Sequence, residues 1–285
     1  MKRLLLIVVV LASVARAEVP VEAAEEGPHE AVDIVTLTDE SVLRGRIVAE
    51  DDTLVVLETL LGRIEIPRDR IRLIERVRSS GRRDYEGNPD PDTNTVFFTP
   101  TPETLGAGSY FRNFLLFFLN YGVSVHDDVD LSFGTIFPIS SDVASISGGV
   151  KWRLLSRTEH PVGAALVANG TIIDDYRSAT VGGVVGIGNE NRSLNVAVGR
   201  YLERDRDDDA TVVLVGADLR LGAQTKFLIE YGTSSEVIED DVNGLINFGF
   251  RWFNDRMSFS LTGFRPLEDT GSFVVFPFTM FSLHF

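Results

Sequence analysis

The sequence predicts an all-β protein: an antiparallel transmembrane β-barrel of about twelve strands, preceded by a small five-stranded β-barrel domain. Three observations lead to this prediction. Segments after residue 93 alternate between small or apolar and polar residues, residues 32–78 contain short strands separated by tight turns, and the chain ends on an apolar strand face at Phe285. A soluble domain has little reason to end so apolar, because chain ends usually fray in water.

The first residues predict a secretory signal peptide over residues 1–17. A basic Met1-Lys2-Arg3 precedes an apolar run, and Ala15-Arg16-Ala17 has the small-x-small pattern of a cleavage site. The apolar run is too short for a transmembrane helix, which needs about 20 residues. Removing this segment takes away three basic residues and no acid, so the formal charge falls from −15 to −18. Such an acidic protein is a poor partner for nucleic acid.

The chain contains no cysteine, which excludes disulfide bonds, thiol chemistry and lipid attachment through cysteine. Residues 18–31 are acidic and rich in Ala and Pro, and predict a disordered leader. Residues 32–78 form the predicted small domain, with a short helical turn at Asp69-Arg70. Its expected strands are 32–37, 42–49, 53–60, 63–67 and 71–77. Residues 79–92 have no apolar period and contain several Pro and Gly residues, and they predict a linker.

The small domain carries the pattern Ile-Val-Thr-Leu-x-Asp, then Leu-Arg-Gly-Arg-Ile-Val, then Gly-Arg-Ile-Glu-Ile-Pro-x-Asp-Arg-Ile. This pattern resembles small Sm-like or SH3-like barrels. Behind a signal peptide, we expect the domain in the periplasm. Its basic residues alternate with Asp and Glu, which is typical of a solvated face, while the alternative is a docking surface for a periplasmic protein or an anionic polymer. These residues are Arg44, Arg46, Arg63, Arg68, Arg70, Arg72 and Arg76.

The outer-membrane domain is expected over residues 93–285, because no later stretch is apolar enough for a spanning helix and only a closed barrel satisfies strand amides in lipid. The predicted strands are 93–101, 108–124, 128–139, 144–155, 161–173, 178–188, 191–202, 210–222, 224–234, 242–253, 255–265 and 272–285. Short periplasmic turns and longer outer loops, including Pro102 to Ala107, are expected to alternate between them. Pro100 and Pro102 weaken the first strand, and the alternative is ten strands with an internal first segment.

The last strand places Phe281, Leu283 and Phe285 on one face and His284 on the other. It resembles the closing strand of bacterial outer-membrane β-barrels. That resemblance implies that these three residues form the assembly signal. It also implies that the partners of the barrel are outer-membrane lipid and the barrel assembly machinery.

Strand alternation also predicts which charged side chains face the lumen. The lumen-lining candidates are Lys151, Arg153, Asp218, Arg220, Lys226, Glu230, Arg251 and Arg256. The outer loops are acidic instead, with Asp205, Asp207, Asp208, Asp209, Glu236, Glu239, Asp240, Asp241, Glu268 and Asp269. A basic neck below an acidic rim favours anions in an open pore, but paired charges can also simply close the wall.

The sequence therefore favours a structural protein or a passive channel for small solutes, with a periplasmic docking module. A pore would carry ion current that falls when Arg251 and Arg256 are neutralised. Neither a cofactor nor a metal site is predicted, because the acidic loop at 205–209 lacks the glycine and glutamate of a calcium loop. One alternative is a lipid hydrolase, since the outer-membrane phospholipase family also has twelve strands. Ser124 and His126 are its nearest candidate pair, although the His-x-Ser order of that family is missing. Another alternative is an adhesion or scaffold protein without a pore.

Overall fold

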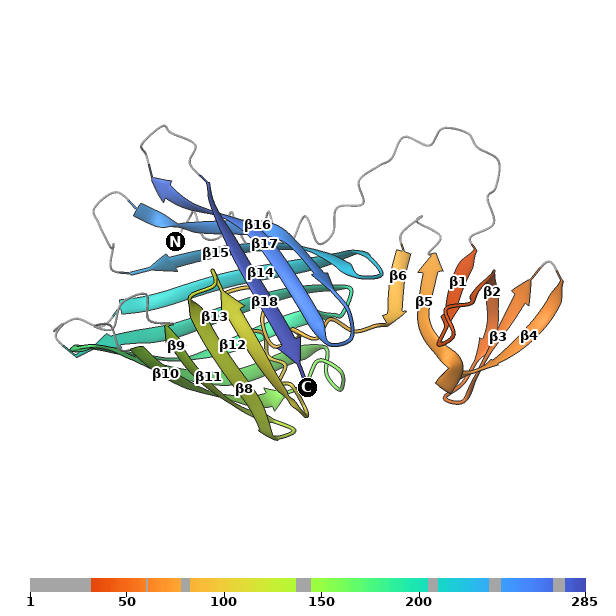
Figure 1. The fold of residues 1–285 in the computed structure, drawn as a ribbon, viewed down its shortest axis with the longest axis horizontal. Helices are drawn as coiled ribbons and strands as arrows, with labels where there is room; N and C mark the ends of the chain where they lie inside the picture. The colour runs from red at the N-terminus through yellow and green to blue at the C-terminus, as the bar shows by residue number, and fades with distance from the viewer. Residues whose placement is uncertain are drawn as a thin grey trace.

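The computed structural model describes residues 32–59, 61–77, 83–136, 145–204, 210–235, 242–268 and 275–285. These residues form an N-terminal six-stranded antiparallel sheet and a closed twelve-stranded antiparallel barrel, which lie end to end (Figure 1). The predicted signal peptide and leader lie outside the described residues. Within the described ranges, no helix is long and apolar enough to cross a membrane.

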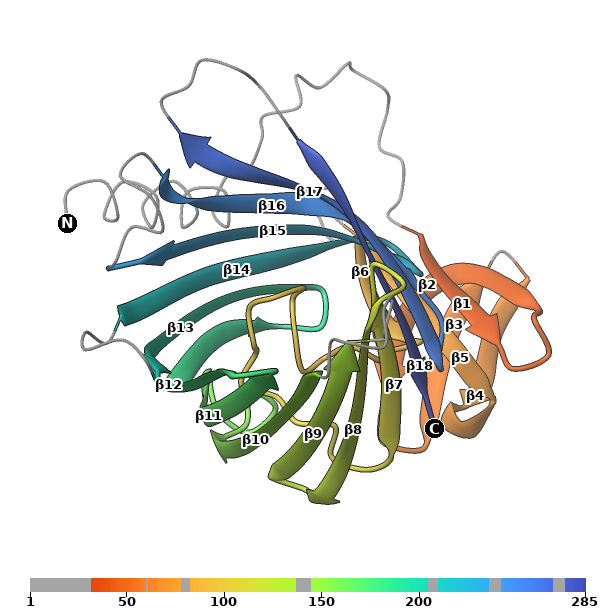
Figure 2. The same cartoon turned by 60° about the vertical axis from the view of Figure 1, so that its left-hand side comes forward.

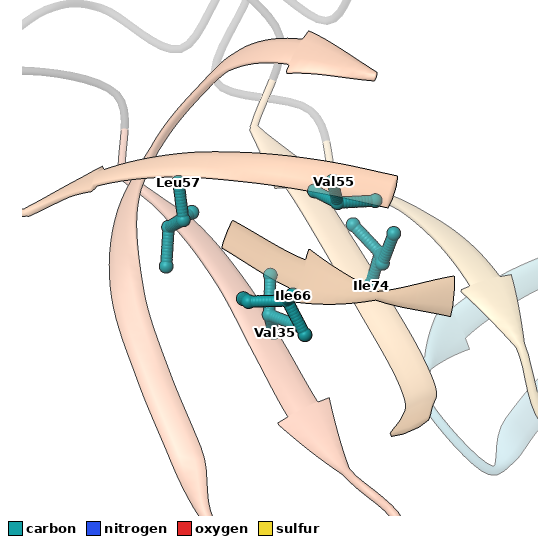
Figure 3. Packing of buried hydrophobic residues seen from close by; sticks show 5 residues of the cluster. All are labelled: Val35, Val55, Leu57, Ile66 and Ile74. Carbon is teal, nitrogen blue, oxygen red and sulfur yellow. The ribbon is translucent and has the colours of Figure 1, made fainter. Parts of the chain in front are cut away.

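The N-terminal sheet has the strand order β4-β3-β2-β1-β5-β6. Its elements are β1 (Asp33–Leu37), β2 (Val42–Glu50), β3 (Leu54–Thr59), β4 (Gly62–Pro67), the 3₁₀ helix η1 (Arg68–Arg70), β5 (Ile71–Val77) and β6 (Arg83–Gly87). The sheet curves around a small apolar core, because alternate residues of each strand point to the same side (Figure 3). The buried members of this core are Val35, Val55, Leu57, Ile66 and Ile74.

Two predictions for this region need correction. The expected five-stranded closed barrel is a six-stranded open sheet whose edges are β4 and β6. The sixth strand, β6, falls inside the predicted linker 79–92 and pairs antiparallel with β5. Its sequence, Arg-Asp-Tyr-Glu-Gly, has no apolar alternation of its own, so only its pairing partner makes it a strand. The predicted helical turn at Asp69-Arg70 is confirmed as η1.

The barrel is formed by β7 to β18, and pairing of β9 with β10 and of β18 with β7 completes the ring. Its strands are β7 (Ser109–Phe114), β8 (Phe118–His126), β9 (Val129–Ile136), β10 (Ser145–Leu155), β11 (Val162–Ile173), β12 (Tyr176–Asn189), β13 (Arg192–Glu203), β14 (Ala210–Gly222), β15 (Thr225–Ser234), β16 (Val242–Phe253), β17 (Met257–Glu268) and β18 (Phe276–His284). The predicted all-β class and the count of twelve barrel strands are confirmed.

The predicted number of barrel strands is correct although two of the predicted strand assignments are wrong. The predicted strand 93–101 is not part of the wall, and the predicted strand 108–124 is two strands, β7 and β8, joined by a tight turn at 115–117. In that turn Leu115 and Leu116 have φ values of 50° and 68°, and the Asn113 side chain accepts a hydrogen bond from the Leu116 amide at 3.0 Å. Left-handed leucines are unfavourable by roughly 1–2 kcal/mol each, so no local residue preference indicated a turn there.

The two ends of the barrel differ. At the end that we call the base, β7 begins, β18 ends, and short turns connect β8–β9, β10–β11, β12–β13, β14–β15 and β16–β17. The N-terminal sheet lies beyond this end (Figures 1 and 2). The opposite end, the rim, carries the remaining connections; the predicted acidic loop residues between 205 and 209, between 236 and 241, and at 269 lie outside the described residues. The predicted outer loop Pro102 to Ala107 is wrong, because this segment contacts the base turn at Asp127.

Large apolar side chains cover the outside of the barrel, as strand alternation predicted. Trp152 and Trp252 are 53% and 43% exposed on the outer face. Other exposed side chains of this band include Ile146, Phe133, Val181, Val185, Phe250, Phe259 and Phe281. Exposed apolar area on this scale is unusual for a soluble monomer and is typical of a surface that contacts lipid.

Candidate channel lumen and its internal plug

Residues 88–107 leave the N-terminal sheet and fill the lumen of the barrel, and we call this segment the plug. In Figure 2 the yellow-gold chain that follows β6 runs inside the ring of strands. The segment contains four prolines, three acids and no basic residue. This corrects the predicted wall strand 93–101 and matches the internal first segment of the alternative prediction. Proline lacks the amide that a wall strand needs. The amides of residues 97–99 and 105 bond to wall carboxylates, and those of residues 92, 95, 96 and 101 bond within the plug.

The deepest part of the plug is a hairpin at residues 94–101. Thr95 and Pro100 form an isolated bridge, and the Val96 amide donates to the Thr99 carbonyl at 2.9 Å. The Glu230 carboxylate from β15 accepts hydrogen bonds from three successive backbone amides at the tip, those of Phe97 at 3.0 Å, Phe98 at 2.9 Å and Thr99 at 2.7 Å. Glu230 is itself buried, so its charge is satisfied largely by the plug backbone.

Arg251 from β16 holds the other side of the same hairpin. Its guanidinium donates to the carbonyls of Asp92 and Thr95, each at 3.3 Å, and to the carbonyl of Val96. The same group forms an ion pair with Asp90 at 3.0 Å. Its side chain is 1% exposed, so the guanidinium is almost fully removed from water. A charge this deeply buried needs partners on all sides, and the plug supplies most of them.

The carboxylates of Asp90 and Asp92 anchor the start of the plug to the wall. Asp90 lies 3.2 Å from the Lys226 ammonium, which also lies 3.2 Å from Asp218. Asp92 pairs with Arg112 of β7 at 2.7 Å. Asp92 also accepts a hydrogen bond from Ser258 and lies 3.0 Å from the His284 imidazole. These contacts tie the plug to strands on both sides of the seam between β18 and β7.

Glu103 anchors the end of the plug. Its carboxylate pairs with Arg157 at 3.1 Å and lies 3.6 Å from Arg153. Lys151 donates to the carbonyls of Asn94 at 2.6 Å and Glu103 at 3.1 Å. The only wall carboxylate in this group, Asp130, accepts the Leu105 amide at 3.0 Å. The plug therefore presents its acids and carbonyls to wall cations, and its amides to wall carboxylates.

Apolar contacts also hold the hairpin. Val96 and Phe97 pack against Leu228 and Met280, two buried lumenal residues of the wall. The ring centroid of Phe98 lies 5.7 Å from that of Phe278 and 6.4 Å from that of Phe114, on which it stacks. Phe98 remains 41% exposed. Burial of these rings adds to the polar contacts.

Glycines in the wall make room for the plug. A Cβ added at Gly216 would lie 2.8 Å from the Thr99 side chain. A Cβ at Gly163 or Gly186 would lie 2.9 Å from the ring of Pro102. These distances are shorter than normal carbon–carbon contacts, so larger residues at these positions would push the plug out of its place. Close packing of the plug therefore depends on glycine at these three wall positions.

Two of the cavities beside the plug are bordered by its anchoring residues. The larger, of about 310 Å³, extends to the base turns and is bordered by Asp90, Asp218 and Lys226 together with Arg157 and Glu190. The smaller, of about 170 Å³, lies between the hairpin and the wall and is bordered by Phe98, Arg112, Asp130, Lys151 and Asn169. Both are large enough to hold several waters, and most of the residues that border them are charged or polar.

The N-terminal sheet is fastened to the base of the barrel where the plug begins. The Asn191 side chain, in the β12–β13 turn, accepts from the Tyr85 amide and donates to the Tyr85 carbonyl, each at 3.0 Å. Asn191 thus occupies the free edge of β6 as a neighbouring strand would. Arg220 of β14 donates to the carbonyls of Gly87 at 3.4 Å and Asn88 at 3.0 Å, and its guanidinium lies over the rings of Tyr85 and Phe253.

The structure brings most of the sequence-predicted lumenal residues to the plug. Lys151, Arg153, Lys226, Glu230 and Arg251 all contact it directly, while Asp218 contacts it through Lys226. Arg220 lies at the entrance to the plug. Arg256 is different, because it lies in the exposed β16–β17 turn at the base.

The sequence reasoning missed Arg112, Arg157, Asp90, Asp92 and Glu103. A signal for the last three was present, since the segment from 88 to 107 combines two Pro-x-Pro pairs with acids and lacks any base. Arg112 was missed because the prediction treated β7 and β8 as one strand.

The Ser124–His126 pair of the hydrolase alternative is placed on β8 near the base. The Ser124 hydroxyl donates to the backbone carbonyl of His126 at 2.9 Å, and the His126 Nδ1 accepts from the Asp128 amide at 3.3 Å. Both groups are therefore engaged with the backbone, whereas a nucleophile and its base would be bonded to each other. Among the described residues, no group of three or more His, Cys, Asp and Glu side chains could hold a metal ion.

The predicted assembly residues lie on β18. Phe281 and Phe285 are 40% and 71% exposed on the outer face, and Leu283 pairs with Phe111 of β7. Backbone hydrogen bonds between Phe285 and Ser109, at 2.9 and 3.2 Å, extend the closing seam to the last residue. Their role as an assembly signal stays a prediction.

No protein-family model matches this chain, and no curated protein matches it. Among solved structures, the chain is similar to the KdgM porin, with 6% identity, a TM-score of 0.48 and coverage of 63% of this chain and 99% of that chain. It is also similar to an anion-selective porin from Comamonas acidovorans, with 12% identity, a TM-score of 0.32 and coverage of 89% and 95%. A third similar structure is OccK11 of Pseudomonas aeruginosa, with 10% identity, a TM-score of 0.33 and coverage of 90% of this chain and 94% of that chain. At such low identities and TM-scores these likenesses carry no argument about function, which rests on the residues of the chain itself.

Proposed function

We propose that this chain is a bacterial outer-membrane protein that works as a passive channel for small solutes and that residues 88–107 close it at rest. The observation that carries the proposal is the way the plug is held. Most of its anchors are ion pairs and hydrogen bonds to lumenal side chains, and polar cavities of about 310 and 170 Å³ lie beside it. A polar interface can exchange its partners for water when the plug leaves. The apolar contacts of Val96 and Phe97 with the wall oppose release and help to keep the channel closed at rest.

The outward band of aromatic and aliphatic side chains supports the membrane location, since it faces away from a polar lumen. Periplasmic placement of the N-terminal sheet is part of this proposal, and the predicted signal peptide and the position of the first and last barrel strands' ends at the base support it. The residues proposed as the assembly signal are Phe281, Leu283 and Phe285.

The N-terminal sheet is the proposed docking module for a periplasmic partner, of the Sm-like or SH3-like kind that its sequence resembles. Its strand order β4-β3-β2-β1-β5, with a 3₁₀ turn before β5, is compatible with that kind. Several of its arginines are paired with glutamates, such as Arg68 with Glu50 at 2.7 Å and Arg76 with Glu86 at 2.9 Å. These pairs favour a protein partner over an anionic polymer, because their positive charge is already neutralised.

The test is conductance of the refolded full chain in planar bilayers, compared with a variant that lacks the hairpin at residues 94–101. We expect the full chain to be mostly closed and the variant to show stable conductance. Arg256→Gln is the matched control, because its side chain is exposed in a base turn and does not hold the plug.

Absence of current from both proteins would contradict the channel and favour the adhesion or scaffold alternative. In that case the full chain with an affinity tag, compared with a variant lacking residues 32–78, is the tool for recovering a periplasmic partner. Lipid turnover that is lost in Ser124→Ala would instead favour the hydrolase alternative.

A further inference from the structure

The charges of the wall and of the plug are opposite in sign. Six cationic side chains of the wall reach the plug carboxylates or the carbonyls beside them: Arg112, Lys151, Arg153, Arg157, Lys226 and Arg251. The described wall and turn carboxylates in the same region are Asp128, Asp130, Glu190, Asp218 and Glu230. Asp128 is already paired with Arg153 at 2.8 Å, and Asp130 and Glu230 bind plug amides. The plug brings Asp90, Asp92 and Glu103 and no basic residue.

The plug carboxylates are therefore bound in the way that a foreign anion would be. Asp92 accepts from Arg112 at 2.7 Å, and a hydroxyl from Ser258 adds a second donor. Asp90 lies between Lys226 at 3.2 Å and Arg251 at 3.0 Å. Pairs of cations with added hydroxyl donors, removed from bulk water, are typical of carboxylate recognition.

Moving the plug away would take carboxylate or carbonyl partners from Arg112, Lys151, Arg157 and Arg251. Lys226 would keep Asp218 and Arg153 would keep Asp128. Uncompensated buried charges are strongly unfavourable, so the vacated lumen would take up water and anions. A lumen with an excess of fixed positive charge raises the local concentration of anions and repels cations. A solute that binds only the vacated lumen would also shift the equilibrium toward the open state.

We propose that the plug is an internal stand-in for an anionic solute, and that the open channel selects small molecules with several carboxylates. This inference rests on the proposed channel function and names its substrate class. Asp90, Asp92 and Glu103 occupy three carboxylate subsites along the lumen. A solute with more than one carboxylate competes with them, and the wall cations keep their partners throughout the exchange.

The first experiment uses the variant lacking residues 94–101 with Asp90→Asn, Asp92→Asn and Glu103→Gln added, so that no plug carboxylate remains. Its ion selectivity is measured in a potassium chloride gradient across a planar bilayer. We expect a severalfold preference for chloride over potassium. Adding Lys151→Gln and Lys226→Gln to this variant should remove most of that preference, while adding Arg256→Gln should leave it unchanged. Migration of the unheated barrel on a gel, compared with the boiled protein, shows that each variant is folded.

The second experiment keeps the chain intact and so does not depend on folding of the deletion. Citrate is added to the full-length channel, with glycerol as the neutral control and spermidine as the cationic control. We expect citrate alone to raise the open probability severalfold. The triple variant Asp90→Asn, Asp92→Asn, Glu103→Gln should open without citrate.

The outcomes separate the two proposals. Current that is unselective or selective for cations, or equal opening by citrate and glycerol, would overturn the carboxylate inference and leave the channel in place. No current from any variant would overturn both.

Discussion

The carboxylate of Glu230 lies 2.7 Å from the backbone nitrogen of Thr99 and also accepts the two preceding amides, so one wall side chain satisfies the whole tip of the plug. The buried carboxylate needs hydrogen-bond donors, and the buried amides of the turn need an acceptor. Removing either partner leaves unsatisfied polar groups, which is unfavourable by about 1–3 kcal/mol for each group. This contact therefore reports directly on whether the plug is seated.

Glu230→Ala should release the hairpin tip. The amides of Phe97, Phe98 and Thr99 lose their acceptor, and we expect their hydrogen exchange to become about 5–150 times faster, from the loss of about 1–3 kcal/mol. Native-state hydrogen exchange with mass spectrometry checks this. The amide of Val96, which is bonded to the Thr99 carbonyl within the hairpin, is the internal comparison. Unchanged exchange at all three amides would show that Glu230 does not hold the tip.

Arg251→Gln should raise the conductance of the full chain, in contrast to the sequence-based expectation that neutralising this residue lowers it. The substitution leaves Asp90 and several plug carbonyls without a cation, and breaking a buried pair of this kind is unfavourable by about 3–5 kcal/mol. Bilayer recordings of Arg251→Gln beside Arg256→Gln test this. Equal currents from the two variants would argue that the plug is not gated by Arg251.

Gly186→Val should displace the plug at Pro102. The added side chain would meet the proline ring at 2.9 Å or less, and overpacking of this kind is destabilising by about 1–3 kcal/mol. We expect faster proteolysis within residues 88–107 while the barrel stays intact. Gly170→Ala is the control, since its nearest neighbour would be a carbonyl oxygen at 3.8 Å. Equal cleavage rates in both variants would contradict the seating role of Gly186.

The double substitution Thr99→Cys with Gly216→Cys should lock the channel shut. The chain has no cysteine of its own, so any disulfide would be the engineered one. A Cβ at position 216 would lie 2.8 Å from the Thr99 side chain, and a shift of about 1 Å brings the pair to normal disulfide spacing. We expect the oxidised variant to stay closed even with citrate, and the reduced variant to open with or without citrate, because an unbonded side chain at position 216 crowds the plug. Opening in the oxidised state would mean that the plug need not leave this part of the wall.

The N-terminal sheet should lose a little stability in acid. Burial raises the pKa of Glu86, but hydrogen bonds from Arg68 and Arg76 outweigh it and lower the pKa below 4.5. A carboxyl with a lowered folded pKa stabilises the fold above its unfolded pKa, and that stabilisation disappears as the pH falls through the folded value.

Because Glu86 is largely exposed, the effect should stay below about 1 kcal/mol. Thermal unfolding of the full chain between pH 6 and pH 3, compared with Glu86→Gln, measures it. A variant with the same pH dependence as the natural chain would show that the pair contributes nothing.

The alternation of apolar and polar residues in the sequence determined most strands of the barrel wall and the faces of their side chains. Alternation in segments such as 144–155 and 242–253 matched β10 and β16 almost to the residue, because strand geometry puts successive side chains on opposite faces whatever the rest of the chain does. The same alternation placed Lys226, Glu230 and Arg251 on the lumenal face. Turns with Asn or Gly were also predictable from residue preference.

Only the tertiary structure decided where residues 88–107 go and that β7 and β8 are separate. The plug has no periodic apolar pattern, and its conformation comes from Glu230 and Arg251, which lie far away in sequence, and from Arg112 on the strand that follows it. The Leu115–Leu116 turn opposes the local preference of leucine and exists because ring closure requires a strand there. β6 is a strand because β5 and Asn191 supply its hydrogen bonds. Strand periodicity is local information, whereas the partner of a buried charge or of an unpaired amide is known only when the chain has closed around it.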